Sequence, residues 1–378
     1  MKIGIVCYPT FGGSGVVATE LGIELSSRGH EVHFITYSQP VRLDLLSHNV
    51  HYHEVNVPKY PLFLYQPYEL ALSSKLVDMV KLHQIEILHV HYAIPHAYAG
   101  YMAKKILEDE GIYLPIVTTL HGTDITLVGS HPHYKAAVAF SINKSDAVTS
   151  VSQSLKDDTL RLFDIKNKIS VVPNFIDLDK HTNGFTDCQR STLANDNEKI
   201  ITHISNFRPV KRIKDVVLIF YNIQKEMPAK LMMVGEGPSK VLAEDYCREL
   251  GIEDKVVFFG NSNEIDRILC FSDLFLLPSE TESFGLSALE AMASSVPVIS
   301  SNTGGIPEVN INDFSGYLSD VGDVTSMSKN ALCILKDETH LAKFKENAKT
   351  QASKFDIHQI VPLYEKIYED TLKNCLLL

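Results

Sequence analysis

The chain has 378 residues, of which 45% are apolar and 21% are charged, as in a folded globular protein. This length predicts two or three domains, because single hydrophobic cores stop growing well below it. The net charge of −11 argues against broad binding to nucleic acid or to anionic membranes, and no apolar segment is long enough to span a bilayer.

The first half of the chain alternates short β-branched runs with amphipathic helical stretches. This succession predicts parallel strands joined by right-handed crossovers. A glycine-rich turn follows the first strand, and a loop rich in Tyr and Pro covers residues 51–68. In chain order the predicted elements are the strand KIGIVCY, the helix VVATELGIELSSRGH, the strand EVHFITY, a helix near 69–83, the strand IEILHVHY, a helix near 96–110, the strand PIVTTLH, a helix near 132–144 and the closing segment SDAVTSVS.

A second series of the same kind begins at KISVVPNF, which places a seam near residues 165–175. The tail IHQIVPLYEKIYEDTLKNC predicts a closing helix with a kink or restart at Pro362. Between them we predict the strand KIITHIS, the helix KDVVLIFYNIQKEM, the strand AKLMMVG, the helix SKVLAEDYCRELG, the strand KVVFFG, a helix near 263–271, the strand DLFLLPS, the segment ETESFGLSALEA and the strand VPVISS.

The two series predict an α/β protein of two doubly wound, Rossmann-like domains of similar size. The predicted domains are residues 1–168, joined by the C-terminal helix at about 360–378, and residues 169–359. Ligands of open parallel sheets bind at the carboxyl ends of the strands. We therefore expect the two domains to face each other across a cleft that holds the site.

The segment FGGSGVVATELG, residues 11–22, follows the first strand directly. Its glycines let the backbone approach a ligand, and the helix N-terminus that follows offers N–H groups to a phosphate. A plain tight turn and a dinucleotide site are the alternatives. The third glycine of a dinucleotide fingerprint is replaced by Ala18, and no Asp or Glu closes the next strand to bind a ribose.

The segment SNFRPVKRIKD, residues 205–215, carries four cations within seven residues of an acidic protein: Arg208, Lys211, Arg212 and Lys214. A solvated helix start is the simple interpretation. However, cations at a helix N-terminus oppose the helix dipole. Their position after a strand therefore favours an anionic ligand such as a diphosphate.

The segment ETESFGLSALEA, residues 280–291, contains Glu282 and Glu290 with no basic partner nearby in sequence. On a continuous helix the two acids would lie about 80° apart, toward one side of the helix start. A carboxylate can accept hydrogen bonds from two neighbouring hydroxyls, so the pair fits the hydroxyls of a sugar and of a ribose. Helix-dipole complementarity explains Glu282 equally well but does not explain Glu290.

Over nearly its whole length the chain resembles the retaining GT-B glycosyltransferases of family 4. Glu282 and Glu290 match that family's E-x7-E pair, and further motifs are GGSG, HGTD at 121–124, VVPNFID at 171–177 and VGEGP at 234–238. HVHYAIPHAYAG at 89–100 and NFRPVKRIKD look most like the branch of the family that acts in bacillithiol biosynthesis. The branch that glycosylates inositol phosphate is a more distant likeness.

The resemblance implies a UDP-sugar-dependent hexosyltransferase with UDP-N-acetylglucosamine (UDP-GlcNAc) as donor. In the family's roles Glu290 holds the ribose, Glu282 and the amides of Phe284, Gly285 and Leu286 hold the transferred sugar, and Lys211 holds the diphosphate. The family's arginine, five residues before that lysine, is replaced by Asn206, so Arg208 takes its role here. The remaining residues implied are His121 near the sugar ring and, at the donor, Gly13, Ser14, Gly15, Asn206 and Gly235.

The resemblance also implies L-malate as acceptor, with Tyr92, Thr119 and Lys135 as its contacts. Cations and amides can stabilise the leaving diphosphate, so we expect no metal and no other cofactor. Asp177-Leu178-Asp179 only superficially matches the metal-binding DxD motif of other glycosyltransferases. A zinc site at His89, His91 and His96 is disfavoured, because the sequence shows no third ligand beside the first two.

The sequence predicts a cytoplasmic protein. It begins without a signal peptide, and its six cysteines form no CxxC pair, which favours free thiols in a reducing compartment. Homo-oligomerisation stays open. The alternative functions are transfer to a lipid or polysaccharide, for which the 51–68 loop could serve, non-catalytic binding of a nucleotide sugar, and NAD-dependent oxidoreduction.

Overall fold

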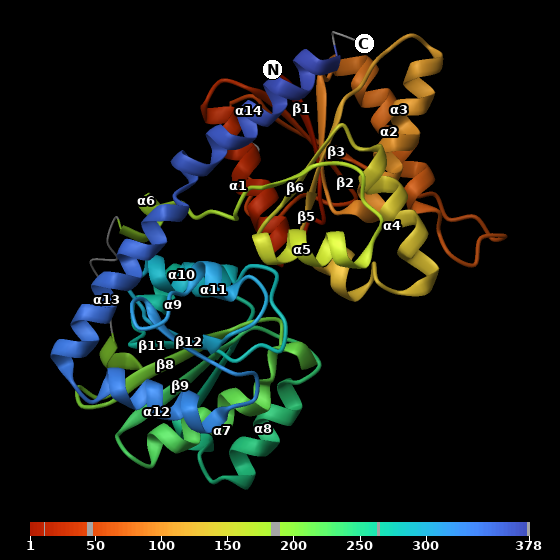
Figure 1. The fold of residues 1–378 in the computed structure, drawn as a ribbon. Coiled ribbons are helices and arrows are strands. Elements are labelled where there is room, and N and C mark those ends of the chain that lie inside the picture. The colour runs from red at the N-terminus through yellow and green to blue at the C-terminus, as the bar shows by residue number, and fades with distance from the viewer. Residues whose placement is uncertain (11, 44–47, 183–189, 263–264, 376–378) are drawn as a thin grey trace. The chain divides into compact units, whose positions relative to one another are not determined.

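The computed structural model describes residues 1–378 except 11, 44–47, 183–189, 263–264 and 376–378 (Figure 1). The chain divides into two compact units. The first comprises Met1–Asn174 and Ile357–Leu378, and the second comprises Phe175–Asp356. Each unit contains one parallel sheet with helices on both faces (Figure 1), which confirms the predicted fold class.

The sheet of the first unit has seven strands in the order β3-β2-β1-β4-β5-β6-β7. Its central strands β4 and β5 are buried throughout, as expected for strands covered on both faces. The strands are β1 (Lys2–Val6), β2 (Glu31–Thr36), β3 (Val50–Glu54), β4 (Ile87–His91), β5 (Ile116–Leu120), β6 (Ala147–Ser150) and β7 (Ile169–Val171).

Helices α2 and α3 cover one face of this sheet, and α1 and α14 cover the other (Figure 1). Local signals fix some helix starts. Pro132 occupies the first position of α4, and the Ser152 side chain caps α5 by accepting the Leu155 N–H at 3.0 Å. The helical elements are α1 (Gly13–Ser27), α2 (Tyr68–His83), η1 (Ala93–Ala97), α3 (Tyr98–Asp109), η2 (Thr123–Leu127), α4 (Pro132–Lys144), α5 (Gln153–Leu162) and α14 (Ile357–Cys375).

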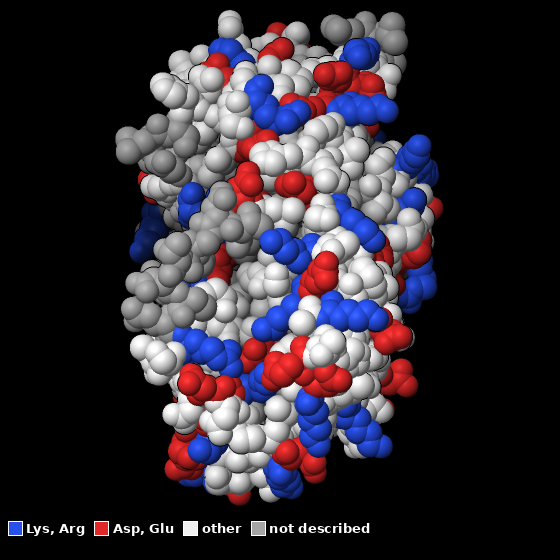
Figure 2. Space-filling model, turned by 90° about the vertical axis from the view of Figure 1, so that its left-hand side faces the viewer, with Lys and Arg blue, Asp and Glu red and all other residues white. Residues whose placement is uncertain are grey.

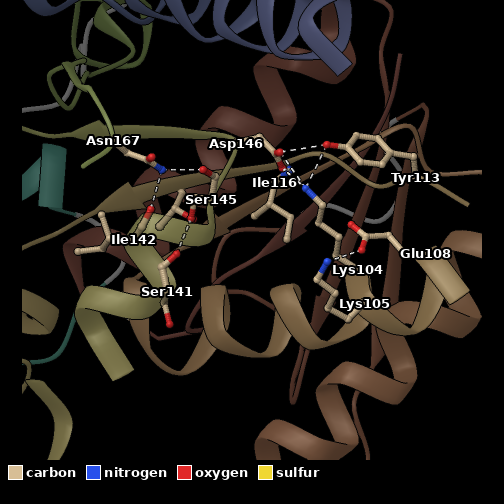
Figure 3. Close-up of polar contacts among 11 residues, drawn as sticks. Lys104, Lys105, Glu108, Tyr113, Ile116, Ser141, Ile142, Ser145, Asp146 and Asn167 are labelled. Atoms are coloured by element: carbon tan, nitrogen blue, oxygen red, sulfur yellow. Dashed lines mark hydrogen bonds and ion pairs between the residues drawn. The ribbon is translucent and has the colours of Figure 1, made fainter. Parts of the chain in front are cut away.

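A polar network ties α3 to the amino ends of β5 and β6 (Figure 3). The buried Lys104 ammonium donates to both carboxylate oxygens of Asp146 at 2.8 Å, and the Ile116 N–H donates to the same carboxylate at 2.7 Å. Nearby, Asn167 donates to the carbonyls at the end of α4, at 2.7 and 2.9 Å. These bonds lie at the edge where the strands begin, so they support the sheet and leave its carboxyl edge for other groups.

Helix α14 brings the C-terminal segment back to the first unit. Glu365 pairs with Arg28 at 2.7 Å and with His30 at 3.0 Å, near the end of α1. Tyr364 and Tyr368 are fully buried, and the Tyr368 hydroxyl lies 2.7 Å from Nδ1 of His89 on β4. The C-terminal helix is therefore part of the core of the first unit.

The sheet of the second unit has six strands in the order β10-β9-β8-β11-β12-β13. The strands are β8 (Lys199–Ile204), β9 (Ala229–Val234), β10 (Val256–Gly260), β11 (Leu274–Leu277), β12 (Val298–Ser301) and β13 (Gly316–Ser319). Helices α7, α8 and α12 cover one face, and α9, α10 and α11 cover the other (Figure 1). A cluster of buried side chains from α7, α12, β9 and β11 forms its core, with Phe220 and Leu276 among them.

The helical elements of the second unit follow the same alternating pattern. They are α6 (Leu178–Thr182), η3 (Arg190–Thr192), η4 (Pro209–Lys211), α7 (Ile213–Gln224), α8 (Lys240–Glu249), η5 (Glu253–Lys255), α9 (Ile265–Leu269), α10 (Leu286–Ala293), α11 (Ile306–Val309), α12 (Val324–Leu335), α13 (Glu338–Ala352) and η6 (Ser353–Phe355).

The structure differs from the sequence prediction at two strands of the first sheet. Strand β3 lies in what the sequence presents as the start of a Tyr- and Pro-rich loop. Strand β7, which we assigned to the second half, pairs with β6 in the first sheet. Along the chain, the boundaries between the units therefore fall at 174/175 and 356/357, whereas the predicted boundaries were 168/169 and 359/360.

The prediction that the cysteines are free thiols is wrong for one residue. Cys7, Cys247, Cys333 and Cys375 are free thiols, as expected, but Cys270 is disulfide-bonded. The nearest cysteine along the chain, Cys247, is one of the free ones, so no short spacing in the sequence could have signalled this bond.

The surface carries both signs of charge. On the face drawn in Figure 2, acidic and basic side chains are interspersed. Among the helices of the described residues, none is long and apolar enough to cross a membrane.

Candidate active site

In the first unit the predicted site residues come from the carboxyl ends of β1, β4 and β5. Helix α1 begins at Gly13, and the side chain of its second residue, Ser14, lies 2.6 Å from the Tyr92 hydroxyl. A Cβ on Gly15 would lie 2.5 Å from the Thr10 carbonyl and 2.6 Å from the Tyr8 carbonyl. The glycine turn can thus fold back on itself at the helix start only because residue 15 has no side chain.

Tyr92 follows β4 and has a φ of +85°, which is rare for a residue with a bulky side chain. Its N–H donates to the Thr119 carbonyl at 2.9 Å, so the end of β5 fixes this backbone. The Tyr92 ring lies 5.1 Å from the rings of both Tyr8 and His121. Three strand ends therefore contribute to one aromatic and polar cluster beside the start of α1.

Asp124 ties the loops after β4 and β5 together, a role that sequence reasoning missed. Its carboxylate accepts the N–H of Ala93 at 2.8 Å, of Gly122 at 3.0 Å and of His121 at 3.2 Å. Burial raises the pKa of Asp124 to about 6, although these backbone hydrogen bonds act in the opposite direction. The HGTD motif contained the signal, but only the fold shows that the aspartate holds the histidine loop.

The histidines of the first unit form a buried neutral group. His121 Nε2 lies 2.8 Å from His91 Nδ1, and His96 Nδ1 lies 2.6 Å from the His91 carbonyl. Burial lowers the pKa of His121 to about 3 and that of His96 to about 4, and holds the pKa of His91 well below its usual value. At neutral pH His121 can therefore offer a hydrogen bond to a ligand but not a positive charge.

The side chains of two predicted acceptor residues make their contacts elsewhere. The Thr119 hydroxyl is buried between His89 Nε2 at 2.7 Å and the Thr149 hydroxyl at 2.6 Å, so it serves the interior of the sheet. The exposed Lys135 extends from the first turn of α4, with its ammonium 5.9 Å from the centre of the Phe163 ring. Direct contact of either residue with an acceptor stays a prediction.

In the second unit the cationic segment follows β8. Phe207 is fully buried and has a φ of +37°, and its N–H lies 3.2 Å from the Ser205 hydroxyl. This buried ring anchors a loop whose neighbours Asn206 and Arg208 are exposed. The Glu280 N–H donates to the Val210 carbonyl at 2.8 Å, which joins the cationic segment to the loop that carries Glu282.

Lys211 and Glu282 form an ion pair between the two predicted donor motifs. Their side chains are only 17% and 15% exposed, so solvent screens the pair less than it would at the surface. The Lys211 ammonium has three N–H donors, and Glu282 uses one of them. The partner that Glu282 lacked in the local sequence is therefore a lysine 71 residues earlier.

The loop that carries Glu282 is held by Gly304 and Gly305, which sequence reasoning also missed. A Cβ on Gly304 would lie 1.9 Å from the Glu282 carbonyl, and the Gly305 N–H donates to that carbonyl at 2.9 Å. The glycine pair in the loop after β12 was the available signal, because adjacent glycines permit such close backbone approach.

Glu282 and Glu290 do not lie on one continuous helix, so the relation of about 80° considered for such a helix does not apply. Helix α10 begins at Leu286, and its N-cap Gly285 has a φ of +96°, so Glu282 lies in the loop before it. Glu290 lies within the helix and is half-buried, while Phe284 is buried against Phe355. The first amides of α10, like those of any helix, lack acceptors within the helix.

The remaining predicted residues have structural explanations. Gly235 follows β9 and packs so closely that a Cβ would lie 1.8 Å from the Ser205 carbonyl. Asp177 accepts the Asp179 N–H at 3.1 Å and pairs with Lys180 at 3.5 Å, as a residue that begins a short helix does. The structure thus brings Lys211 together with Glu282 and Ser14 with Tyr92, each pair within its own unit.

Two Rossmann-like domains, each with predicted site residues at the carboxyl ends of its strands, match the GT-B fold of glycosyltransferases. The structure resembles that of sucrose-phosphate synthase from Thermosynechococcus elongatus, with a TM-score of 0.81 at 18% identity over 99% of this chain and 100% of the other. It also resembles Anabaena HepE, solved with UDP and glucose, with a TM-score of 0.81 at 19% identity over 98% and 100% of the two chains.

The chain belongs to the family 4 glycosyltransferases. The profile of Glycosyltransferase Family 4 matches residues 11–180, and the profile of Glycosyl transferases group 1 matches residues 185–351. The chain is 46% identical to the N-acetyl-alpha-D-glucosaminyl L-malate synthase of Bacillus anthracis, over 99% of this chain and 98% of that protein. The family predicted from the sequence is confirmed.

Proposed function

We propose that the protein transfers N-acetylglucosamine from UDP-GlcNAc to the hydroxyl of L-malate, with retention of configuration, as the first step of bacillithiol synthesis. The observation that carries the choice of acceptor is the 46% identity to a malate synthase over nearly the whole of both chains. The ion pair between Lys211 and Glu282 supports the assignment of the donor site. A cytoplasmic location is part of the proposal.

The second unit supplies the donor contacts. Glu290 holds the ribose hydroxyls, and Glu282 with the amides of Phe284, Gly285 and Leu286 holds hydroxyls of the sugar. Each carboxylate accepts hydrogen bonds from neighbouring hydroxyls, and the N-terminal amides of α10 donate to oxygen atoms. Lys211 directs its remaining donors at the diphosphate while Glu282 keeps the ammonium in position.

The chemical step exchanges one bond at the anomeric carbon for another on the same face. The bond from this carbon to the β-phosphate oxygen breaks, the bond to the malate hydroxyl oxygen forms, and the leaving phosphate takes the hydroxyl proton. Charge grows on the diphosphate as its bond breaks, and fixed donors stabilise that change. Lys211 and the exposed Arg208 are the cations assigned to this role, together with the amides at Gly13, Ser14 and Gly15.

The first unit supplies the acceptor side in this proposal. His121 is neutral because burial lowers its pKa to about 3, so it serves as a hydrogen-bonding group near the sugar ring. Tyr92 is positioned by Ser14 and by the end of β5. The two carboxylates of malate require donors, and Tyr92 and Lys135 are the assigned candidates. The positive charge of lysine and the hydrogen bonds from backbone amides take the place of a metal ion at the diphosphate. We therefore propose that Mg²⁺ and Mn²⁺ are not required.

The test is an incubation of the chain with UDP-GlcNAc and a panel of acceptors, with UDP and the glycoside both quantified. L-malate should release UDP and yield its N-acetylglucosaminide in equal amounts, without added Mg²⁺ or Mn²⁺. UDP binding without release across the panel would favour a non-catalytic sensor. Release that depends on added Mg²⁺ would contradict the metal-free step.

The structure offers one observation in favour of a lipid acceptor. The loop between β3 and α2, which projects from the first unit (Figure 1), exposes Leu62, Leu64 and Tyr65 by 82%, 86% and 84%. Apolar side chains flanked by cations favour a membrane surface, but Lys59 is the only cation in the segment 55–70. Flotation with anionic lipid vesicles distinguishes the two functions, and the malate proposal predicts that the protein stays unbound.

A further inference from the structure

Four histidines and a glutamate gather at one edge of the first unit, away from the residues assigned above. Glu31 and His33 lie on β2, His51 and His53 lie on the edge strand β3, and His83 ends α2. His33 stands opposite His51 in the strand register. Because side chains alternate along a strand, the four strand residues share one face of the sheet. Glu31 begins β2, so the cluster lies toward the edge where the strands start.

The ring nitrogens of this cluster converge. His33 Nδ1 and His53 Nε2 are 2.9 Å apart, and the His83 ring lies 4.7 Å from each of the other two rings. One ligand atom from each of these three histidines lies within 4.8 Å of the others. His33 is buried, and His53 and His83 are half-buried. Three imidazoles thus hold nitrogen atoms close enough together to share one ion after small side-chain shifts.

We propose that His33, His53 and His83 bind one zinc ion, which fastens the edge strand β3 and the end of α2 to β2. Zinc–nitrogen bonds of about 2.0–2.1 Å place two tetrahedral ligand atoms roughly 3.3 Å apart. The His33–His53 pair, now at hydrogen-bond distance of 2.9 Å, must open slightly, and the set, whose ligand atoms lie within 4.8 Å of one another, must close around the ion. Three protein ligands leave a fourth position for water.

Glu31 hydrogen-bonds one of the proposed ligands, His33. Its Oε1 lies 3.2 Å from His33 Nε2, so a proton on Nε2 can bond the carboxylate while the lone pair on Nδ1 faces the ion. A carboxylate behind a metal-binding histidine fixes the tautomer and the ring orientation. Lys2 lies 3.4 Å from the other oxygen of Glu31 and balances its charge.

His51 defines the competing ligand set. Its Nε2 lies 3.5 Å from Glu31 Oε1, and its ring stacks on His33 at 4.7 Å, so Glu31, His33 and His51 also lie within ligand distance of one another. A neutral imidazole has one lone pair, so His33 can bind an ion in only one of the two sets. His51 is exposed, which favours the more enclosed set with His53 and His83.

The chemistry of the ligands selects the ion. Imidazole nitrogens suit Zn²⁺, Cu²⁺ and Ni²⁺, whereas Mg²⁺ and Ca²⁺ prefer oxygen ligands. The site is therefore separate from any role of Mg²⁺ or Mn²⁺ in sugar transfer, and its occupancy can be measured without turnover. Binding to the folded state alone would stabilise the first unit by mass action.

The test measures bound zinc and thermal stability in the untagged full-length chain. Chelator-treated protein is dialysed against low micromolar zinc, and metal per chain is determined by mass spectrometry. We expect one zinc per chain and a higher Tm than for the metal-free protein, with no such shift for Mg²⁺. His53→Gln and His83→Gln should each lose the zinc, and His48→Gln, an exposed histidine of the same unit, should retain it.

Two further variants separate the ligand sets. His51→Gln should keep one zinc, and Glu31→Gln should bind it about 10- to 100-fold more weakly, as expected when an outer carboxylate is lost. Loss of zinc from His51→Gln with retention in His53→Gln would overturn the assignment in favour of the other set. Far-UV circular dichroism of the metal-free variants checks their folding, and His83→Gln, at a helix end, carries the test if His53→Gln does not fold. Substoichiometric zinc in the unmodified chain would overturn the proposal altogether.

Discussion

Lys211 and Glu282 form a charge pair that, in our proposal, prepares a site for a diphosphate. The two side chains come from different loops and meet in a setting with little solvent exposure. A lysine held in this way keeps its donors aimed at the position where charge develops, and no reorganisation is needed during the reaction. Replacing it removes a stabilising donor and leaves Glu282 unpaired.

We expect Lys211→Ala to lower turnover by roughly 10²–10³-fold, which is the scale for one lost transition-state donor. Lys214→Ala is the matched control, because Lys214 belongs to the same cationic segment but lies 4.6 Å from the centre of the Tyr246 ring. Steady-state rates with UDP-GlcNAc and malate measure both variants. A change under about threefold for Lys211→Ala would remove Lys211 from the mechanism.

Gly15 offers a second test at the scale of a single residue. Gly15→Ala places a methyl group 2.5 Å from the Thr10 carbonyl and should displace the start of α1. In the same turn, the nearest described atom beyond the chain neighbours to a Cβ on Gly12 is the Thr10 hydroxyl oxygen, at 3.4 Å, so Gly12→Ala should be tolerated. We expect UDP release to fall at least tenfold for Gly15→Ala and to change little for Gly12→Ala. Equal rates for the two variants would show that the close turn has no part in catalysis.

Helix α14 is joined to the core of the first sheet through Tyr368. Its hydroxyl bonds His89, which in turn bonds Thr119, at the end of β5. Tyr368→Phe leaves a buried histidine nitrogen without its partner, which costs about 1–3 kcal/mol. Denaturant unfolding followed by circular dichroism measures the change, since the chain has no tryptophan.

Tyr364→Phe is the control for this element. The Tyr364 hydroxyl is equally buried and lies near Thr119 and Thr149 without a hydrogen bond of normal geometry. Its removal should change the free energy of unfolding by less than about 0.5 kcal/mol, because no good hydrogen bond is lost. If both variants lose the same stability, packing rather than the hydrogen bond to His89 holds α14 in place.

The strands show how far the sequence determines the fold. Long apolar runs such as IEILHVHY predicted β4 and its neighbours, because a strand buried on both faces has a continuous apolar signal. Strand β3 has the polar sequence VHYHE and lies at the sheet edge, where that signal is weak. The three residues of β7 belong to the first sheet because they pair with β6. The local sequence pattern does not show which strand a segment will pair with.

The candidate site was predictable to a similar extent. The motifs containing Lys211, Glu282 and Ser14 could be identified from residue type and position after a strand. Their pairing partners could not, because the Lys211–Glu282 and Ser14–Tyr92 contacts join segments 71 and 78 residues apart. Asp124 was missed for the same reason, since its bond to the Ala93 N–H joins loops that only the fold brings together.

We expect the buried histidines to make the protein less stable in acid. Burial lowers the pKa of His89 and His121 to about 3 and that of His96 to about 4, from the ordinary value of 6.5. As the pH falls below about 6.5, the unfolded chain takes up protons that the folded chain does not, so the free energy of unfolding decreases. Asp124 has the opposite effect on the free energy of unfolding, between its raised pKa of about 6 and the ordinary value of 3.8. It is a single group, however, whereas several histidines have a lowered pKa.

This sensitivity should be greater in the first unit. Among the described residues, more histidines with a lowered pKa lie in the first unit than in the second, where burial lowers the pKa of His203 to about 4. Hydrogen exchange of metal-free protein, corrected for the intrinsic rate, should show β4 and β5 losing protection between pH 6.5 and 4 before β8 and β11. Earlier loss in the second unit, or constant stability over this range, would contradict the assignment of buried neutral histidines.

The most direct test of the account is a crystal structure of the chain with UDP and L-malate. We predict the diphosphate on Lys211, the ribose hydroxyls on Glu290, and malate near Tyr92 with its hydroxyl directed at the position of the transferred sugar. A nucleotide bound elsewhere, or Glu282 and Glu290 directed into bulk solvent with UDP present, would contradict the account.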